Sequence, residues 1–376
     1  MRTKSWLALA AVTILVIAGA VYVVSKQDQA TSEQTAEETL FPKLMAEIND
    51  VALVRIRKGN VTLHVVRDAA GAWALKEKDN YRASASKVKK AVVAMADMRV
   101  IEAKTAKPAL YSKIGVEDVD AKDAESILLE LEDKTGRSMA RLLVGRTRSF
   151  EAAAKPGKIY VRRPEEARAW LVSARLDVKA EAMSWLDLAT VKVAKTRVQR
   201  VVTRHDDGET VTVLREDPKI DQFTLQNIAD GFKLVSQQRT GAMSAALEYF
   251  NYEDVLPAAK KPLTDGVATT DIETRDGLRV TLRAIAENDY YWATVSAAYD
   301  ESLIVTDDAA KSDTKAATKS PDQIRQEVKD INARVGGWVY KLPEYRGQNF
   351  YRRMTDLVEA EKTAENDKAG SASEKE

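Results

Sequence analysis

A long internal repeat constrains this chain more than any other feature of its sequence. Apolar and polar residues alternate on both sides of a turn at Gly59, and the same alternation surrounds a turn at Gly208, about 150 residues later. The short strand patterns at 73–75 and 223–225 are separated by the same interval. Two copies of one supersecondary pattern are explained better by two similar modules than by two unrelated domains.

A helix is predicted after each of these meanders, because apolar residues recur there at helical spacing. In the first copy, Ser84 or Ser86 supplies the N-cap. The first apolar stripe is Val88, Val92 and Met95, and the second is Leu225, Ile228, Phe232 and Val235.

The second halves of the two copies also correspond. The strand pattern at 127–131 ends in a turn at Gly136 and matches the strand that precedes Gly277. Residues 158–161 match residues 291–295. We therefore predict an α+β fold of two related modules, each an antiparallel β-meander plus a helix.

The C-terminal part of the second copy begins with a helix that has clear boundary signals. Ser320 is the predicted N-cap, Pro321 occupies the first helical position, and Gln323 completes a capping box. Glycines at 336 and 337 end the helix. Trp338, Tyr340 and Leu342 then alternate as a strand, and a last helix is predicted around Phe350, Met354 and Leu357.

An apolar run at 6–24 follows Arg2 and Lys4 at the N-terminus. As a helix this run would span about 28 Å, which is close to the hydrocarbon thickness of a bilayer. A single transmembrane anchor is the first reading. A cleaved signal peptide is the alternative, because residues 18–20 supply an A-x-A arrangement of small residues. Both readings predict export.

The positive charges before the run predict that the N-terminus stays in the cytoplasm and that the rest of the chain is periplasmic. The predicted location is a bacterial inner membrane with a single pass. The predicted organisation is a cytoplasmic stub and anchor at 1–25, a flexible spacer at 26–40, the first module at 41–180, the second module at 181–358 with an exposed loop at 306–321, and a disordered charged tail at 359–376.

The composition excludes several kinds of chemistry. Cysteine is absent and histidine occurs twice, so there is no disulfide framework, thiol nucleophile, thiolate zinc site or iron–sulfur cluster. The 58 Lys and Arg residues nearly balance the 57 Asp and Glu residues, which argues against nucleic acid as a partner. No phosphate-binding, dinucleotide-binding or metalloprotease motif is present, so no cofactor and no metal is predicted.

The patterns described above resemble a known family. The resemblance rests on the meander that ends at 73–75, on the segment at 111–116, and on the segment at 337–343. It is the domain-of-unknown-function family 4340, and the resemblance extends over roughly 41 to 358. It implies a membrane-anchored envelope protein, since members are often encoded beside ABC-transporter components of the gliding-motility or auxiliary type. It implies no catalytic residues.

One arrangement imitates a hydrolase. Ser84 and Lys87 fit the S-x-x-K motif of penicillin-binding enzymes, and residues 134–136 fit K-T-G. Residues 249–251 imitate a variant of the middle motif of these enzymes, but K-T-G precedes them in this chain and lies too close to Ser84 for the usual intervening helical region. A helix cap and a hairpin turn explain both motifs, so a serine hydrolase remains the alternative and no catalytic residue is predicted.

The two histidines and two groups of surface residues are the remaining candidates. His64 is expected on the polar face of a strand, and His205 in a solvated turn beside Asp206 and Asp207. A basic sheet face and two aromatic concentrations form a candidate interaction surface, although a solvated strand face and core packing explain them too. The candidate residues are Arg137, Arg141, Arg146, Arg148, Tyr290, Trp292 and Trp338.

These observations predict a non-enzymatic, membrane-anchored periplasmic protein that binds or scaffolds other components. The expected partners are the membrane, through residues 6–24, and proteins of an ABC-type complex. An envelope polymer is a further possible partner. A cell-wall glycan-binding protein or an envelope hydrolase is the alternative function.

Overall fold

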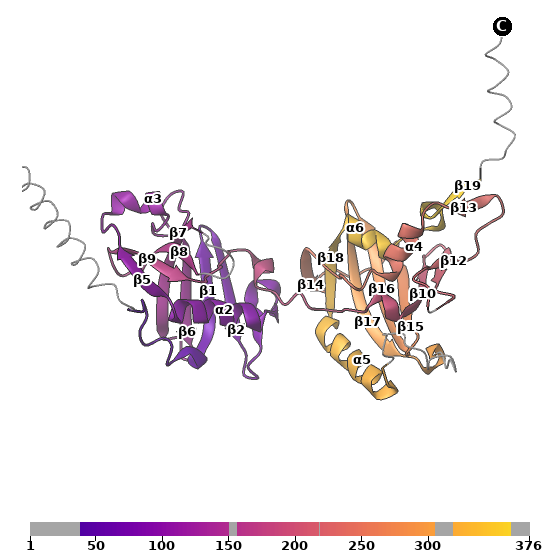
Figure 1. The fold of residues 1–376 in the computed structure, drawn as a ribbon, viewed down its shortest axis with the longest axis horizontal. Coiled ribbons are helices and arrows are strands. Elements are labelled where there is room, and N and C mark those ends of the chain that lie inside the picture. Colours follow the sequence, from indigo (N-terminus) through magenta and orange to yellow (C-terminus); the bar gives the residue numbers. More distant parts are fainter. Residues whose placement is uncertain (1–37, 150–155, 218, 305–318, 362–376) are drawn as a thin grey trace, which may run out of the picture. The chain divides into compact units, whose positions relative to one another are not determined.

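The computed structural model describes residues 38–149, 156–217, 219–304 and 319–361. The fold is mixed α and β, with mostly antiparallel sheets and few helices. The chain divides into two compact units, Met1–Leu186 and Asp187–Glu376 (Figure 1). Among the described residues, no helix is both long enough and apolar enough to cross a membrane. The predicted anchor lies outside the described residues, as do most of the predicted spacer, exposed loop and tail.

The first unit is built on a nine-stranded sheet with hydrogen-bonded neighbours in the order β4-β3-β2-β1-β6-β7-β8-β9-β5. The strands are β1 (Val51–Lys58), β2 (Val61–Arg67), β3 (Trp73–Leu75), β4 (Tyr81–Arg82), β5 (Arg99–Ala103), β6 (Ile127–Asp133), β7 (Ser138–Ser149), β8 (Gly157–Arg162) and β9 (Ala169–Ala174). Its helices are α2 (Ala85–Ala96) and α3 (Tyr111–Ile114). The predicted turn at Gly59 joins β1 and β2, and pairing of Lys58 with Val61 leaves residues 59 and 60 as the turn.

The second unit is built on an eight-stranded sheet in the order β12-β11-β10-β15-β16-β17-β18-β14. The strands are β10 (Val198–Arg204), β11 (Thr210–Leu214), β12 (Thr224–Leu225), β14 (Asp254–Pro257), β15 (Ala268–Thr274), β16 (Leu278–Glu287), β17 (Tyr290–Tyr299) and β18 (Trp338–Pro343). A separate ribbon pairs β13 (Phe232–Leu234) with β19 (Val358–Ala360). The helices are α4 (Gln237–Ser244), α5 (Pro321–Val335) and α6 (Glu344–Gly347).

The two sheets have the same strand order once β4 is set aside, with β1 taking the place of β10 and β5 that of β14. Each sheet also has a register shift at the start of its first strand, opposite a glutamate of the next strand: Val51/Leu53 opposite Glu132, and Val198/Arg200 opposite Glu273. A β-bulge is a specific local irregularity of strand pairing. Its presence at the same place in both sheets is therefore a strong sign that the two sheets correspond.

The core of each unit follows the alternation of its central strands. In β1, Val54 and Ile56 are fully buried, and Leu129 and Leu131 face them from β6. The predicted stripe of α2, at 88, 92 and 95, is buried as well. A helix and a sheet that each have one apolar face bury those faces together.

Helix α5 has the predicted boundaries. Ser320 is its N-cap, and Gln323 returns the capping-box hydrogen bond to the Ser320 N–H. The Asn332 side chain bonds both the N–H and the C=O of Ala297, each at 2.8 Å. β18 pairs only with the first half of β17, so it does not reach Ala297. The Asn332 amide therefore takes the place of a strand partner for the Ala297 N–H and C=O.

The predicted helix at 225–235 is wrong. Residues 224–225 form β12, residues 232–234 form β13, and the helix begins only at Gln237. Asn227 and Gly231 have positive φ values of 59° and 82°, which a helix does not accommodate. The apolar spacing there was coincidental, since Phe232 is 45% exposed.

The predicted last helix is also wrong, and two boundaries move. Phe350 and Leu357 are both buried, but they come from separate short turns rather than from one helix.

Order begins before the predicted boundary at 41, because Leu40 is already buried and its N–H bonds the Met98 carbonyl. Ordered structure also continues past 358, since β19 includes Glu359 and Ala360.

Candidate functional site

A basic groove runs along helix α2 of the first unit. It consists of two adjoining cavities, of about 740 Å³ and about 360 Å³, that share Lys90 and Arg175 as lining residues. The larger is lined by Ser86, Lys89, Lys90, Val93, Ala94, Asp97, Arg99, Pro156, Ser173, Ala174 and Arg175. The smaller is lined by Lys87, Lys90, Ala91, Arg175, Asp177, Lys179, Ser184 and Trp185.

Strand pairing explains why these distant segments meet. Arg99, the first residue of β5, pairs with Ser173 of β9, so the end of α2 and the end of β9 lie together. The chain then returns along the helix, where the Ser84 N–H donates to the Trp185 carbonyl at 2.8 Å. The Trp185 indole N–H donates to the Lys179 carbonyl at 2.8 Å and fixes this second wall.

The groove has a strong excess of positive charge. Its lining includes six cations, which are Lys87, Lys89, Lys90, Arg99, Arg175 and Lys179, and two carboxylates, Asp97 and Asp177. Arg99 lies 3.7 Å from Asp97 with both side chains largely exposed, so that pair is weak. Among the described residues, no carboxylate lies within ion-pair distance of Lys89 or Lys90. The groove is therefore suited to an anionic ligand.

The serine and lysine of the S-x-x-K motif have local structural contacts here. Ser84 caps α2 by accepting a hydrogen bond from the Lys87 N–H at 3.5 Å, and its hydroxyl lies 3.1 Å from that of Ser86. The Lys87 Nζ donates to the Leu186 carbonyl at 3.5 Å. Within the described parts of the chain, no cluster of three or more acidic or histidine side chains could hold a metal ion.

The K-T-G motif is the predicted hairpin turn between β6 and β7. The Asp133 carboxylate accepts hydrogen bonds from the Thr135 hydroxyl and N–H and from Arg137. Hydrogen bonds from Thr135, and then from Arg137, hold the pKa of Asp133 well below its usual range. Gly136 takes a φ of 82°, which only glycine adopts easily in such a turn.

Three of the four predicted surface arginines are committed to carboxylates. Arg137 bonds Asp133 at 2.8 Å and Glu47 at 3.0 Å; Arg141 bonds Glu130 at 2.6 Å and contacts Glu165; Arg146 bonds Glu125 at 2.6 Å. Arg148 is exposed. The sheet face that carries them is thus largely neutralised.

Paired carboxylates occur at matching places in the two sheets. Glu130 and Glu132 of β6 bind Arg55, and Asp271 and Glu273 of β15 bind Arg204 and Arg200. The second carboxylate of each pair lies four residues before a turn glycine. Cross-strand ion pairs of this kind stabilise a sheet face rather than mark a ligand site.

The three predicted aromatic residues lie in the second unit, and one of them cannot serve as surface. Trp292 is only 9% exposed, which corrects its placement on an interaction surface. Tyr290 is half-buried with the Lys341 Nζ 3.3 Å from its ring centroid, and Trp338 is half-buried in β18. Strand alternation thus buries Trp292 and leaves Tyr290 and Trp338 partly accessible.

A different aromatic cluster is exposed in the second unit, on α6 and the loop before β14. Tyr249 and Tyr345 are each 59% exposed. The Arg346 guanidinium lies between them, 5.8 Å and 5.0 Å from the two ring centroids. Its Nε is buried without a hydrogen-bond partner, and no described carboxylate is within ion-pair distance of it. We call these three residues the Tyr-Arg-Tyr cluster.

The expectation of a solvated His205 is wrong. Its side chain is 6% exposed, it packs edge-on against the Tyr351 ring at 5.2 Å, and its Nε2 lies 3.2 Å from the Arg352 carbonyl. The C-terminal segment covers the turn, which the sequence did not indicate. His64 lies on the polar side of β2, as expected, with its Nδ1 2.6 Å from Glu77.

A family model described as "Domain of unknown function (DUF4340)" matches residues 73–266, more than half of the chain. The chain belongs to this family. The DUF4340 match includes all of α2 and all residues that line the groove, but it ends before β15, so the segment at 337–343 that carried part of the resemblance lies beyond it. No curated protein matches the chain, and no solved structure matches it.

Sequence reasoning missed both the groove and the Tyr-Arg-Tyr cluster. Three lysines within four residues of α2 were a visible signal for part of the groove. Arg175 and Lys179 could not be assigned to the same site, because only the pairing of β5 with β9 brings them to the helix.

Proposed function

We propose that this DUF4340 member is a single-pass protein of a bacterial inner membrane, anchored by residues 6–24, whose remaining chain is periplasmic. In this proposal it is a non-enzymatic binding and scaffold subunit of an ABC-type complex. The apolar run, the charges that flank it and the family resemblance support this location and role.

We also infer that the two units are related modules that arose from one repeat. The matching strand order, the matching β-bulge and the matching carboxylate pairs support this inference. A duplicated sheet provides two scaffolds of the same architecture whose surfaces can diverge. The first unit carries a basic groove, and the second carries exposed aromatic residues.

The Tyr-Arg-Tyr cluster is the observation that carries the scaffold function. Tyrosine and arginine are the residue types enriched at the energetic centres of protein interfaces. Two exposed rings that flank a guanidinium offer apolar contact area and an ion-pair donor at one place. Since no carboxylate among the described residues pairs with Arg346, the expected partner is a protein surface that presents an aspartate or glutamate.

The arrangement at Ser84 supports binding rather than catalysis. A serine nucleophile needs a base within hydrogen-bond reach, and the base must be oriented in turn. Here the Lys87 Nζ donates to a backbone carbonyl, and the Ser84 hydroxyl caps a helix. The groove beside them has one carboxylate in each cavity, which does not provide the convergent pair that polysaccharide hydrolysis requires.

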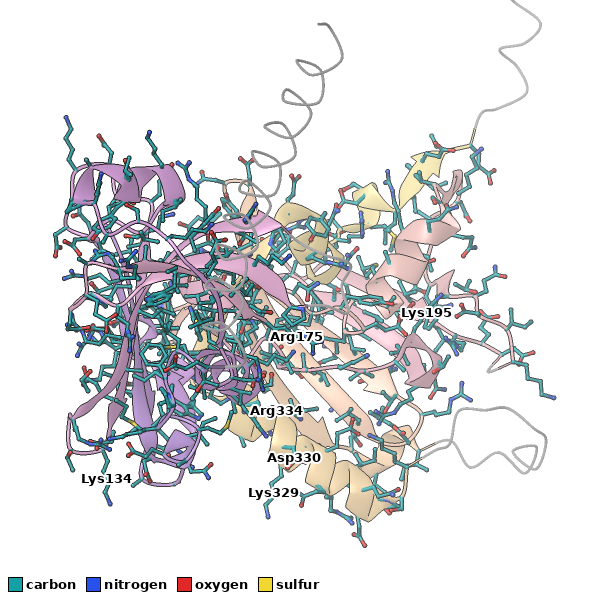
Figure 2. The ribbon with its side chains drawn as sticks, turned by 60° about the vertical axis from the view of Figure 1, so that its left-hand side comes forward. Lys134, Arg175, Lys195, Lys329, Asp330 and Arg334 are labelled. Atoms are coloured by element: carbon teal, nitrogen blue, oxygen red, sulfur yellow. The ribbon has the colours of Figure 1, made fainter. Side chains whose placement is uncertain are left out.

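Site-specific photo-crosslinking in cells tests this function. With p-benzoylphenylalanine in place of Tyr345 in the full-length protein, ultraviolet light should produce a covalent product with an ABC-transporter component, identified by mass spectrometry. Arg346→Glu should remove that product. The same probe at Lys329, an exposed position of α5 (Figure 2), should give none.

The proposal fails if the probe at 345 captures no transporter component, or if the probe at 329 captures the same protein equally well. Thermal melting of the Arg346→Glu protein must match that of the unmodified protein, so that loss of the product reports contact rather than misfolding.

A further inference from the structure

The larger cavity beside α2 is lined by both cationic and apolar side chains, whereas a site for a simple anion needs only the cations. Lys89, Lys90, Arg99 and Arg175 supply positive charge, while Val93, Ala94, Ala174 and Pro156 supply apolar surface. We propose that this groove binds an anionic membrane phospholipid, with the phosphate held by the cations and part of an acyl chain against the apolar residues.

Two of the cationic residues are shared by the two cavities. Lys90 and Arg175 line both, so these two residues lie where the cavities adjoin. An arginine can bind two phosphate oxygens at once, and a lysine adds a mobile point charge. Ser86 and Ser173 add neutral hydroxyl donors, and Asp97 is the single carboxylate of the larger cavity.

The helix makes the apolar part of the site. Positions 86, 90, 93 and 97 follow one another at spacings of three or four residues, so they share one face of α2. Val93 is only half-buried, although the neighbouring Val92 is in the core. An inorganic phosphate would leave this apolar surface exposed to water, whereas an acyl chain would cover it.

The N-terminal part of the chain enters the unit beside this groove. Thr39 forms an antiparallel bridge with Arg99, and the Val100 N–H donates to the Glu38 carbonyl. If the anchor of the proposed function is correct, the 14 residues at 25–38 connect it to this wall. A stretch of 14 residues can span at most about 50 Å, which limits how far the groove can lie from the lipid surface.

Lipid photo-labelling of the full-length protein tests the proposal. The protein is reconstituted in phosphatidylcholine vesicles that contain a trace of photoactivatable phosphatidylglycerol or, in a parallel sample, photoactivatable phosphatidylcholine. Phosphatidylglycerol should label peptides that contain residues 86–99 and 173–179. Labelling by phosphatidylcholine should be roughly tenfold weaker, because its choline cation opposes the groove charge.

Charge reversal at the junction gives the specific control. The double variant Lys90→Glu/Arg175→Glu should lower the phosphatidylglycerol labelling roughly tenfold or more. Lys134→Glu alters the same unit at the exposed hairpin tip, well apart from Arg175 in Figure 2, and should leave labelling unchanged. The charge-preserving double variant Lys90→Arg/Arg175→Lys should keep most of the labelling of the unmodified protein. That result would show that the charge reversal acts through charge.

Three results would overturn the proposal: equal labelling by the two lipids, complete competition by millimolar inorganic phosphate, or an equal loss in Lys134→Glu. Competition by phosphate would identify a soluble anion as the ligand instead. Flotation of the protein with pure phosphatidylcholine vesicles tests the anchor separately. A failed anchor and a failed groove are therefore distinguishable.

Discussion

At the scale of single residues, the buried ion cluster of the second unit shows how charges are used inside this fold. Arg197 makes two hydrogen bonds with Asp276, at 3.0 Å and 3.1 Å, and bonds Glu327 of α5 at 2.9 Å. The Asp276 side chain is only 1% exposed. Burial by itself would raise the pKa of Asp276, but hydrogen bonds from Arg197 and Thr274 outweigh it and lower that pKa.

We expect Asp276→Asn to lower the free energy of unfolding by about 2–3 kcal/mol at pH 7, since Arg197 keeps only Glu327 as a charged partner. A lowered folded-state pKa stabilises the fold above the unfolded value of about 4, and that stabilisation is lost as the pH falls through the folded pKa. The difference between variant and unmodified protein should therefore shrink below about pH 4.

Chemical denaturation at pH 7 and at pH 3 provides the measurement for this prediction. Asp322→Asn is the matched control, because its side chain is 95% exposed and its pair with Arg325 is a surface contact. It should change stability by less than about 0.5 kcal/mol at either pH. A constant difference for Asp276→Asn across this range would contradict the assigned role of its charge.

At the scale of elements, Gly145 explains how α3 can lie directly on the sheet. A Cβ at this position of β7 would be 2.4 Å from the Ile114 carbonyl oxygen and 2.7 Å from a methyl group of Val116. The first contact is backbone, which cannot rotate away as a flexible side chain can. The glycine therefore permits the close approach of the helix C-terminus to the strand.

Gly145→Ala should destabilise the first unit by about 1–3 kcal/mol, the usual cost of overpacking a well-packed site. Gly241→Ala is the comparison, because a Cβ in α4 meets only the Lys195 Nζ, at 3.8 Å. It should be neutral or stabilise by up to about 1 kcal/mol, as alanine favours a helix over glycine. Equal midpoints for both variants in a urea titration would refute the packing role of Gly145.

Local signals predicted some elements correctly and misled in others for an identifiable reason. The caps at Ser84 and Ser320 depend on atoms three residues away, so the sequence contains nearly all the information they need. The helical spacing at 225–235 lacked such caps and contained Asn227 and Gly231, which take left-handed backbone angles. Periodicity without boundary signals was not sufficient there.

At the scale of the whole molecule, the chain has two compact units, each with its own sheet and core. Units with separate cores tend to open as separate cooperative regions. Leu129 in the first sheet and Leu282 in the second are both fully buried. Each therefore probes the core of its own unit.

Leu129→Ala and Leu282→Ala should each cost about 2–5 kcal/mol locally, from lost burial and the cavity left behind. Hydrogen exchange followed by mass spectrometry should show lost protection in β1, β6 and β7 for the first variant, and in β15, β16 and β17 for the second. Loss of protection across both sheets from either substitution would indicate a single cooperative unit instead.

The sequence by itself determined most of the central strands, the turns at 59 and 136, and the capped helices, because these depend on neighbours within a few residues. It also suggested the repeat on which our proposal of two related modules rests. Only the tertiary structure decided which charges are neutralised and which surfaces stay open. Arg55 bonds Glu130 across 75 positions of sequence, and Lys90 and Arg175 line the same cavities only because β5 pairs with β9. Exposure and charge at a surface are set by such distant neighbours, which no local pattern specifies.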